Sequence, residues 1–283
     1  MNRRGAARFA SFDLRTTPEF APMSIAAATP FKPFHDASEL VDRPAELRRR
    51  MRQDGYLFFP RLLQVESVER LRLDILRILR RYGLLDEDAP LEKGVYKGGD
   101  PPGREALLQF HLEINKLESF EALAREPALM EVMSRLIDGH VHVHTRKICR
   151  VKYPFDPYDI VLPHQDFWYI RGAHDTYSAW LPLMEMDDQV GGLAAARGSH
   201  TLGPLPHQVA ERSRFAGISD ETAEGLDWRR SSFQQGGALI FHSLTAHQGL
   251  LNRSPYIRLS MDCRYQREGT AMQASHSRPH FES

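Results

Sequence analysis

The order of predicted elements along the chain most constrains its fold. Helical spacing of apolar residues predicts helices near 38–53, 65–82 and 116–137. From about residue 140 onward, short apolar or alternating segments separated by turn residues predict mainly strands. Helices followed by many short strands favour an α+β or mainly β architecture with flanking helices. A double-stranded β-helix, a jelly roll like that of cupins, fits this order, with the N-terminal helices packed against its larger sheet.

The segment 256–266 has the clearest strand pattern, because apolar and polar residues alternate along it. One interpretation of the polar face is a solvated sheet edge, and we apply it to Arg264 and Gln266. For Arg258 we favour a functional interpretation, since a guanidinium presents a planar fork that matches a carboxylate with two parallel hydrogen bonds. Arg258 is therefore a candidate anchor for an organic acid.

A histidine and an aspartate lie two residues apart in a segment that favours a strand, Ile160–Ile170. On a strand His164 and Asp166 point to the same side, and Gln165 points away. This pattern alone is usually a surface histidine beside a solvated aspartate. A second imidazole, His247, follows the apolar strand predicted at 236–241. Two histidines and one carboxylate form the facial triad of non-haem Fe(II) sites, which keeps positions open for substrate and O2.

Several further motifs occur in a characteristic order between about residues 50 and 267. They are Asp54–Pro60, Trp180–Leu183, Gly191–Leu193, Arg197–His200, Gly236–His247, Asn252 and Arg258. With His164–Asp166, these motifs resemble the phytanoyl-CoA dioxygenase family of Fe(II)/2-oxoglutarate-dependent oxygenases, and in particular its bacterial natural-product hydroxylases. Two residues depart from the family pattern, Gly237 in place of an aspartate and Arg197 in place of a proline, and neither is an implied ligand.

The resemblance implies Fe(II) ligands at His164, Asp166 and His247. It implies that Arg258 holds the distal carboxylate of 2-oxoglutarate and that Trp180 lines the co-substrate pocket. Two further cofactor-binding candidates are Arg150, at a basic position on the preceding strand, and Gln165, which lies between two of the ligands.

The implied reaction consumes 2-oxoglutarate and O2, with ascorbate as the reductant in vitro, and hydroxylates an aliphatic C–H of a small molecule, in a pathway of secondary metabolism. Asp166 argues against halogenation, because the halogenases of this group lack the carboxylate ligand. Candidate substrate-facing residues lie beside the triad motif or in a lid-like insert. They are Phe167, Trp168 and Tyr169, and in the insert Tyr96, Phe110 and His111.

Three alternatives remain open from the sequence. The same cofactors support desaturation, epoxidation or cyclisation, because the outcome depends on the substrate pose. A redox-silent isomerase or lyase could use the same scaffold, although Arg258 and Trp180 argue against it. A ligand-binding jelly roll without catalysis is disfavoured by the intact triad. Four other histidines invite a metal interpretation, which we reject in favour of structural roles for His140, His142, His144 and His242.

Composition limits the remaining possibilities. Lys+Arg and Asp+Glu are both 37 among 283 residues, so charge gives no case for nucleic acid or an anionic membrane surface. The two cysteines form no CxxC and suit a reducing cytoplasm, where we expect a monomer or homodimer. We expect a mobile arm over 1–36, one oxygenase domain over 37–270 with lid-like inserts near 84–112 and 203–232, and a tail over 271–283.

Overall fold

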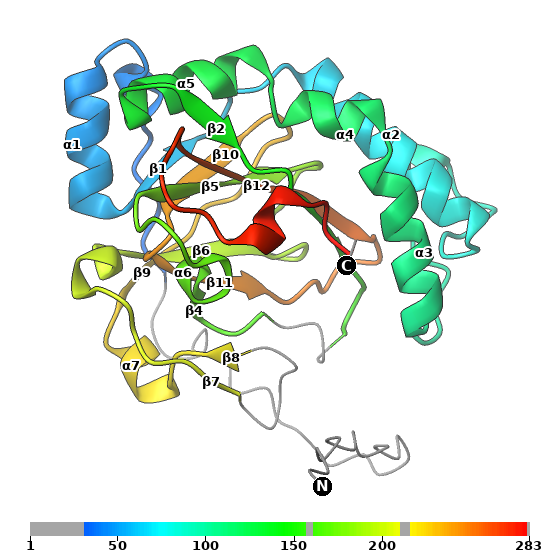
Figure 1. The fold of residues 1–283 in the computed structure, drawn as a ribbon. Coiled ribbons are helices and arrows are strands. Elements are labelled where there is room, and N and C mark those ends of the chain that lie inside the picture. The colour runs from blue at the N-terminus through cyan, green and yellow to red at the C-terminus, as the bar shows by residue number, and fades with distance from the viewer. Residues whose placement is uncertain (1–30, 157–160, 210–215, 282–283) are drawn as a thin grey trace, which may run out of the picture.

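A computed structural model describes residues 31–156, 161–209 and 216–281. Its core is two antiparallel sheets that share apolar side chains between them (Figure 1). The larger sheet has the order β1 (Tyr56–Phe59), β10 (Ala238–His242), β5 (Thr176–Pro182), β12 (Arg258–Arg267) and β2 (Val141–Val143), and β3 (Ile148–Lys152) also pairs with β12. The smaller sheet has the order β4 (His164–Gln165), β11 (Ala246–Leu250), β6 (Gly192–Arg197) and β9 (Asp227–Arg229). This arrangement confirms the jelly-roll prediction.

Helices cover the outer face of the larger sheet, as Figure 1 shows above and beside it. They are η2 (Ser38–Leu40), α1 (Pro44–Asp54), α2 (Val65–Arg81), η3 (Leu91–Lys93), α3 (Arg104–Asn115), α4 (Glu118–Leu123) and α5 (Pro127–Ile137). Their apolar faces share one core with the outward-facing residues of the sheet, including Leu259, Met261 and Tyr265 of β12. The predicted packing of N-terminal helices on the larger sheet is therefore confirmed.

The structure confirms the helix predicted near 65–82 and divides the one predicted over 116–137. Pro127 begins a new helix there, because its fixed φ suits a first turn and it has no N–H to lose. The Glu126 carboxylate accepts hydrogen bonds from the backbone N–H groups of Ala128 and Leu129. The segment predicted over 38–53 likewise begins as η2 and continues as α1.

Asp166 departs from the predicted strand. The strand β4 contains only His164 and Gln165, and Asp166 begins a short helix, α6 (Asp166–Ile170). The backbone N–H of Phe167 donates to the carbonyl of Ser243, and that of Arg171 donates to the carbonyl of Phe167. These contacts outweigh the strand preference of the aromatic residues that follow Asp166.

The polar face of β12 points into the molecule, so the solvated-edge interpretation was wrong for Arg264 and Gln266. Their exposed fractions are 3% and 2%. The reason is topological, because β12 lies between β5 and the strands β2 and β3, so that its apolar face meets the helices and its polar face meets the smaller sheet.

Both ends of the described chain pack against the domain. Phe34, in the segment expected as an arm, is 6% exposed and contacts the rings of Tyr56 and Phe58. Residues 1–30 lie outside the described part. The C-terminal segment returns through η6 (Ala274–Ser277) toward α3 and α6 (Figure 1). The remaining elements are η5 (Ser199–Leu202), β7 (Gln208–Val209), β8 (Ala216–Gly217) and α7 (Asp220–Glu224).

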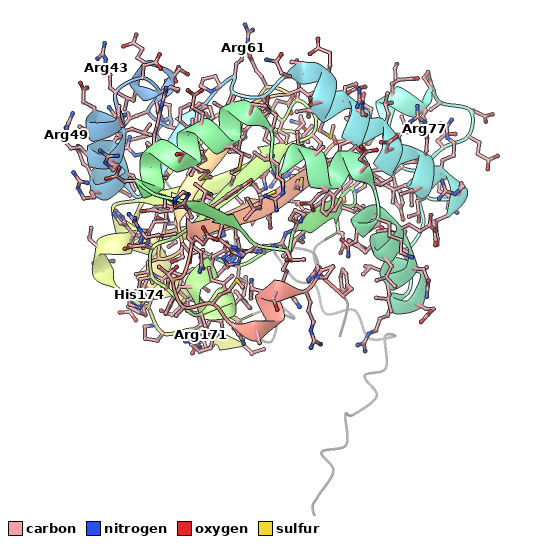
Figure 2. The ribbon with its side chains drawn as sticks, turned by 45° about the horizontal axis from the view of Figure 1, so that its top comes forward. Arg43, Arg49, Arg61, Arg77, Arg171 and His174 are labelled. Carbon is pink, nitrogen blue, oxygen red and sulfur yellow. The ribbon has the colours of Figure 1, made fainter. Side chains whose placement is uncertain are left out.

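The outer surface of the helical layer carries mixed charge. Figure 2 shows Arg43, Arg49, Arg61 and Arg77 projecting outward from this side. Two of them pair with acids on the same helical turn, Arg43 with Glu46 at 3.8 Å and Arg77 with Asp74 at 2.8 Å. No helix within the described ranges is long and apolar enough to cross a membrane.

Candidate metal centre

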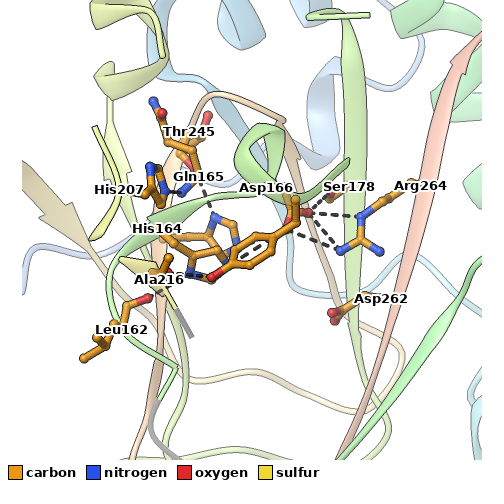
Figure 3. A network of polar contacts seen from close by, with 12 residues as sticks. Leu162, His164, Gln165, Asp166, Ser178, His207, Ala216, Thr245, Asp262 and Arg264 are labelled. Atoms are coloured by element: carbon orange, nitrogen blue, oxygen red, sulfur yellow. Dashed lines mark hydrogen bonds and ion pairs between the residues drawn. The ribbon is translucent and has the colours of Figure 1, made fainter. Parts of the chain in front are cut away.

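Strand pairing brings the two triad histidines together. His164 on β4 and His247 on β11 are Cα partners in the antiparallel register, and their ring centroids are 4.2 Å apart. Oδ1 of Asp166 lies 3.9 Å from Nε2 of each histidine. The three ligand atoms all lie within 4.8 Å of one another, and all three side chains are buried. The sequence-predicted triad is thus one compact cluster, and Figure 3 shows two of its members, His164 and Asp166.

Backbone carbonyls orient both imidazoles. Nδ1 of His164 donates to the carbonyl of Leu162 at 2.8 Å, and Nδ1 of His247 donates to the carbonyl of Thr245 at 3.0 Å. A proton on Nδ1 leaves Nε2 as the lone-pair donor that faces the cluster. Burial also lowers the pKa of both histidines, that of His164 well below its usual value. Both rings are therefore neutral and ready to bind a cation.

Asp166 is held as a carboxylate. Burial acts to raise its pKa, but the neighbouring groups, above all the Arg264 guanidinium, outweigh burial and bring the pKa below its usual value. Arg264 donates to both carboxylate oxygens at 3.3 Å, and the Ser178 hydroxyl donates to Oδ2 (Figure 3). The cluster therefore offers one negative and two neutral ligands.

The triad opens into a cavity that also contains the predicted anion-binding residues. Arg258 and Trp180 line this cavity with the three ligands, and so does Arg150. Its other lining residues are Lys152, Val161, Leu193, Phe241, Gly249, Ser260 and Asp262. One end is cationic, since Arg258 and Lys152 are Cα partners across β12 and β3. Arg150 is paired with Asp262 at 2.8 Å.

Gly191, directly before β6, leaves room for Arg258. Nη1 of Arg258 donates to the carbonyls of Leu250 at 2.7 Å and Gly192 at 3.3 Å. Gly191 has φ +90°, and a Cβ there would lie 2.7 Å from the carbonyl oxygen of Leu251 and 3.2 Å from Nη1 of Arg258. A side chain at this position would push the guanidinium out of place.

The side chain of Gln165 does not line the cavity, which corrects its assignment as a cofactor-binding residue. Its side-chain amide donates to the carbonyls of Gly203 and Leu244, and its Oε1 accepts from the backbone N–H of Leu205. Its backbone N–H donates to Nε2 of His207. Gln165 points away from the ligands because neighbouring residues alternate sides, and it secures the segment near residue 205 behind them.

Two candidates in the 84–112 insert are also corrected. Phe110 is completely buried and packs edge-on against Tyr82 within the helical core. His111 is 8% exposed, and its two ring nitrogens lie within hydrogen-bond distance of the carbonyls of Leu107 and Cys149. The orientation of α3, which the insert's composition does not reveal, turns both side chains inward. Tyr96 is half-buried, and its hydroxyl oxygen lies 3.1 Å from the carbonyl oxygens of both Gly99 and Asp100.

The aromatic residues of α6 divide between two environments. Phe167 packs edge-on against His174, and Trp168 stacks on His207 with ring centroids 4.9 Å apart. Tyr169 instead packs edge-on against His164 at 5.6 Å and is 39% exposed. Because α6 is a helix, it directs only one of these three rings, that of Tyr169, onto the candidate ligand His164.

The other histidines take no part in the triad cluster. Nε2 of His144 donates to Oε1 of Gln266 at 2.9 Å, and its Nδ1 lies 3.4 Å from Nδ1 of His276. His242 is buried and lies 3.3 Å from a carboxylate oxygen of Asp175. Among the residues that the structure describes, the triad is the one group whose ligand atoms converge as a metal would require.

Sequence reasoning missed three contributors to the site. Arg264 and Asp262 were visible as polar residues in phase with Arg258, but whether that face is buried depends on the neighbouring strands. Ser178 stands in a strand of otherwise mainly large or apolar residues, and only the register that places it opposite Arg264 reveals its contact with Asp166.

Comparisons with known proteins agree with this geometry. Residues 51–260 match the family model described as phytanoyl-CoA dioxygenase (PhyH). The 1-deoxypentalenic acid 11-beta-hydroxylase of Streptomyces exfoliatus is 28% identical over 245 residues, covering 82% of this chain and 84% of that protein.

Two solved structures share the fold. The epimerase SnoN in complex with Fe3+, alpha ketoglutarate and nogalamycin RO superposes with a TM-score of 0.60 at 20% identity, covering 83% of this chain and 87% of its own. The carbocyclase SnoK from nogalamycin biosynthesis has a TM-score of 0.56 at 19% identity, covering 81% and 85%. The family match spans most of the chain and includes the triad and Arg258, so this protein belongs to the phytanoyl-CoA dioxygenase (PhyH) family.

Proposed function

We propose that this protein is an Fe(II)/2-oxoglutarate-dependent dioxygenase that hydroxylates an aliphatic C–H of a small molecule. The observation that carries the proposal is a single cavity that joins a buried His–Asp–His cluster to the guanidinium of Arg258. A bound metal alone does not need a nearby guanidinium. A dicarboxylate that chelates the metal needs the metal at one end and a cation at the other.

The donor set suits ferrous iron. Two neutral imidazoles and one carboxylate match the facial triad, and the carboxylate offsets part of the dication's charge. The two cysteines do not add a thiolate, since both are buried and burial raises the pKa of each to about 12. His164, Asp166 and His247 would therefore hold the iron without competition from sulfur.

The cationic end of the cavity suits 2-oxoglutarate. Arg258 is 3% exposed, and its Nη1 is held by the backbone carbonyls of Leu250 and Gly192. A guanidinium held in this way is ready to pair with the distal carboxylate of the co-substrate. Trp180 forms part of the cavity wall and packs edge-on against Phe233, which fixes the plane of its ring.

When bound, iron and 2-oxoglutarate would supply O2 activation and the oxidising equivalent. The chain's own part is to bind, orient and exclude water. The triad lies among buried residues, including Phe241, whose ring centroid is 4.4 Å from that of His247. On the solvent side, the half-exposed ring of Tyr169 covers His164, and its hydroxyl donates to the carbonyl of Ala216.

We propose a small organic molecule of secondary metabolism as the substrate. Support comes from the deoxypentalenic acid hydroxylase relative and from the nogalamycin enzymes that share the fold. Tyr169 is the aromatic residue best placed to meet the substrate. Phe167, Trp168 and Tyr96 remain candidates for a more distant part of the entrance.

The same geometry accommodates a second outcome. SnoN and SnoK are named as an epimerase and a carbocyclase, so this fold is compatible with reactions other than hydroxylation. Mass spectrometry of the product made under 18O2 separates these cases, because hydroxylation adds one labelled oxygen and desaturation, cyclisation or epimerisation adds none.

The test of the cofactor assignment needs no substrate. The metal-free full chain is titrated anaerobically with Fe(II) and then with 2-oxoglutarate, and a weak visible charge-transfer band should appear only when both are present. Asp166→Ala should abolish the band, whereas Asp100→Ala, at an exposed position, should leave it unchanged. Metal binding without any response to 2-oxoglutarate would instead favour a redox-silent isomerase or lyase.

A further inference from the structure

The two oxygens of the Asp166 carboxylate have different surroundings. Oδ1 faces the metal cluster, at 3.9 Å from Nε2 of both histidines. Oδ2 accepts hydrogen bonds from the Ser178 hydroxyl and from Nε of Arg264. Nη2 of Arg264 donates to Oδ1 at 3.3 Å and lies 3.3 Å from Oδ2, so Oδ1 accepts one hydrogen bond where Oδ2 accepts two (Figure 3).

The fold fixes this arrangement through strand register. Ser178 on β5 and Arg264 on β12 are Cα partners, so both side chains leave the sheet on the same inward face. Arg264 and Asp166 are each 3% exposed, and a buried charge of either sign is costly without a partner. A planar guanidinium can engage both carboxylate oxygens at once, which an ammonium cannot do.

We propose that Arg264, assisted by Ser178, is a positioning residue that presents Asp166 to iron through Oδ1 alone. This inference rests on the proposed function. Because Oδ2 is occupied by two donors, it is not offered to the metal. A facial triad leaves its opposite positions open only if each ligand contributes one atom. A carboxylate that chelated through both oxygens would take a position that the co-substrate or O2 needs.

A purely structural ion pair would predict something different. Its loss would lower the stability of the apoprotein, and it would leave the coordination number of any bound metal unchanged. If Arg264 instead positions Asp166, its loss should change the visible absorption spectrum of the bound metal. Co(II) reports this directly, because its visible absorption weakens as its coordination number rises.

The experiment titrates the metal-free full chain with Co(II) and records affinity and absorption. The variants are Ser178→Ala, Arg264→Lys and Arg264→Met, and Arg267→Lys on the last position of β12 is the matched control. We expect Arg264→Met to weaken Co(II) binding about 10- to 100-fold and to lower the visible absorption per bound ion. Arg264→Lys should regain part of the affinity without regaining the spectrum, and Ser178→Ala should shift both in the same direction by less.

Circular dichroism shows whether each apoprotein is folded. If the Arg264 variants do not fold, the Co(II) affinity and spectrum of Ser178→Ala test the inference. Affinity within about two-fold of wild type together with an unchanged Co(II) spectrum in the folded variants overturns the inference. If the wild-type chain itself binds neither Co(II) nor 2-oxoglutarate, the proposed function fails, and with it this inference.

Discussion

Arg258 and Lys152 are Cα partners across β12 and β3, and both line the cavity that contains the metal cluster. Strand pairing therefore places two cationic residues at one end of a small buried space. Arg258 lies among backbone carbonyls that its Nη1 already engages, which limits the positions that its guanidinium can take. This relationship supports our proposal that the cationic end binds a carboxylate in a defined orientation.

We expect Arg258→Lys to weaken 2-oxoglutarate binding about 10- to 100-fold, since hydrogen bonds to charged groups are worth about 1.5–3 kcal/mol. Metal affinity should not change, because Arg258 does not contact the triad. Anaerobic titration of the charge-transfer band measures the first quantity, and Co(II) titration measures the second. Arg253→Lys, at an exposed position nearby, is the control. Equal 2-oxoglutarate affinity in the two variants would show that the co-substrate binds elsewhere.

Loss of a metal-ligating side chain should lower metal affinity and leave the protein folded. We expect His247→Ala to weaken Co(II) binding by more than about 100-fold, because even the outer partners of metal ligands contribute about 10- to 100-fold. The control is His140→Ala, at an exposed position beside β2. Metal content after dialysis, measured alongside circular dichroism, gives the result. A His247→Ala protein that retains a full equivalent of metal would contradict the site.

Acid should destabilise the protein through the buried histidines behind the site. Burial lowers the pKa of both His144 and His276 to about 4. In the unfolded chain a histidine has a pKa of about 6.5, so the unfolded state binds more protons between these values. Stability should therefore be fully present above about pH 6.5, fall as pH is lowered toward 4, and level off below that.

The measurement is the melting temperature of the apoprotein from neutral pH down to 4. His276→Gln should flatten the decline, because one of the groups that must take up a proton on unfolding is gone. His140→Gln, which changes an exposed histidine, should follow the wild-type profile. A wild-type melting temperature that is constant across this range would contradict the assignment of neutral buried rings.

The sequence alone was enough to predict those site residues whose role depends on their spacing within one element or on the order of the motifs. The alternation of 256–266 predicted that Arg258 and its neighbours share a face, and the structure confirms this in β12, where Arg258, Ser260 and Asp262 line the cavity while the residues between them pack in the helical core. It could not reveal that the polar face is buried as well as the apolar one, because that depends on strands that are distant in sequence. Arg264 therefore looked like an edge residue and is instead a buried partner of the candidate ligand Asp166.

The strand expectation at Asp166 shows another limit. His164 and Asp166 do lie side by side, yet Asp166 begins a helix. Aromatic residues favour strands in general, and the contact between the Phe167 N–H and the Ser243 carbonyl overrides that preference locally. The same limit applies to Phe110 in α3, since a loop-like composition upstream did not indicate which way the helix would turn its side chains.

The C-terminal segment should contribute to the stability of the domain. The guanidinium Nε of Arg146 donates to the carbonyl of Ser275 at 2.9 Å, and the side-chain amide of Asn115 donates to the carbonyl of His280 at 2.6 Å. Phe281 adds an edge-on ring contact with His111 at 5.0 Å. These contacts tie the segment to α3 and to the turn between β2 and β3.

Ending the chain after Gln273 removes all of these contacts. We expect the melting temperature to fall by about 5–10 °C, since each net hydrogen bond contributes about 1 kcal/mol and 1 kcal/mol shifts the melting temperature of a domain of this size by about 2–4 °C. A shorter deletion that keeps residues 274–281 is the control and should melt like wild type. The C-terminal segment also lies beside α6 (Figure 1), so the longer deletion should speed hydrogen exchange in α6, which begins at the candidate ligand Asp166. Unchanged exchange in α6 together with an unchanged melting temperature would mean that the segment packs on the domain without supporting it.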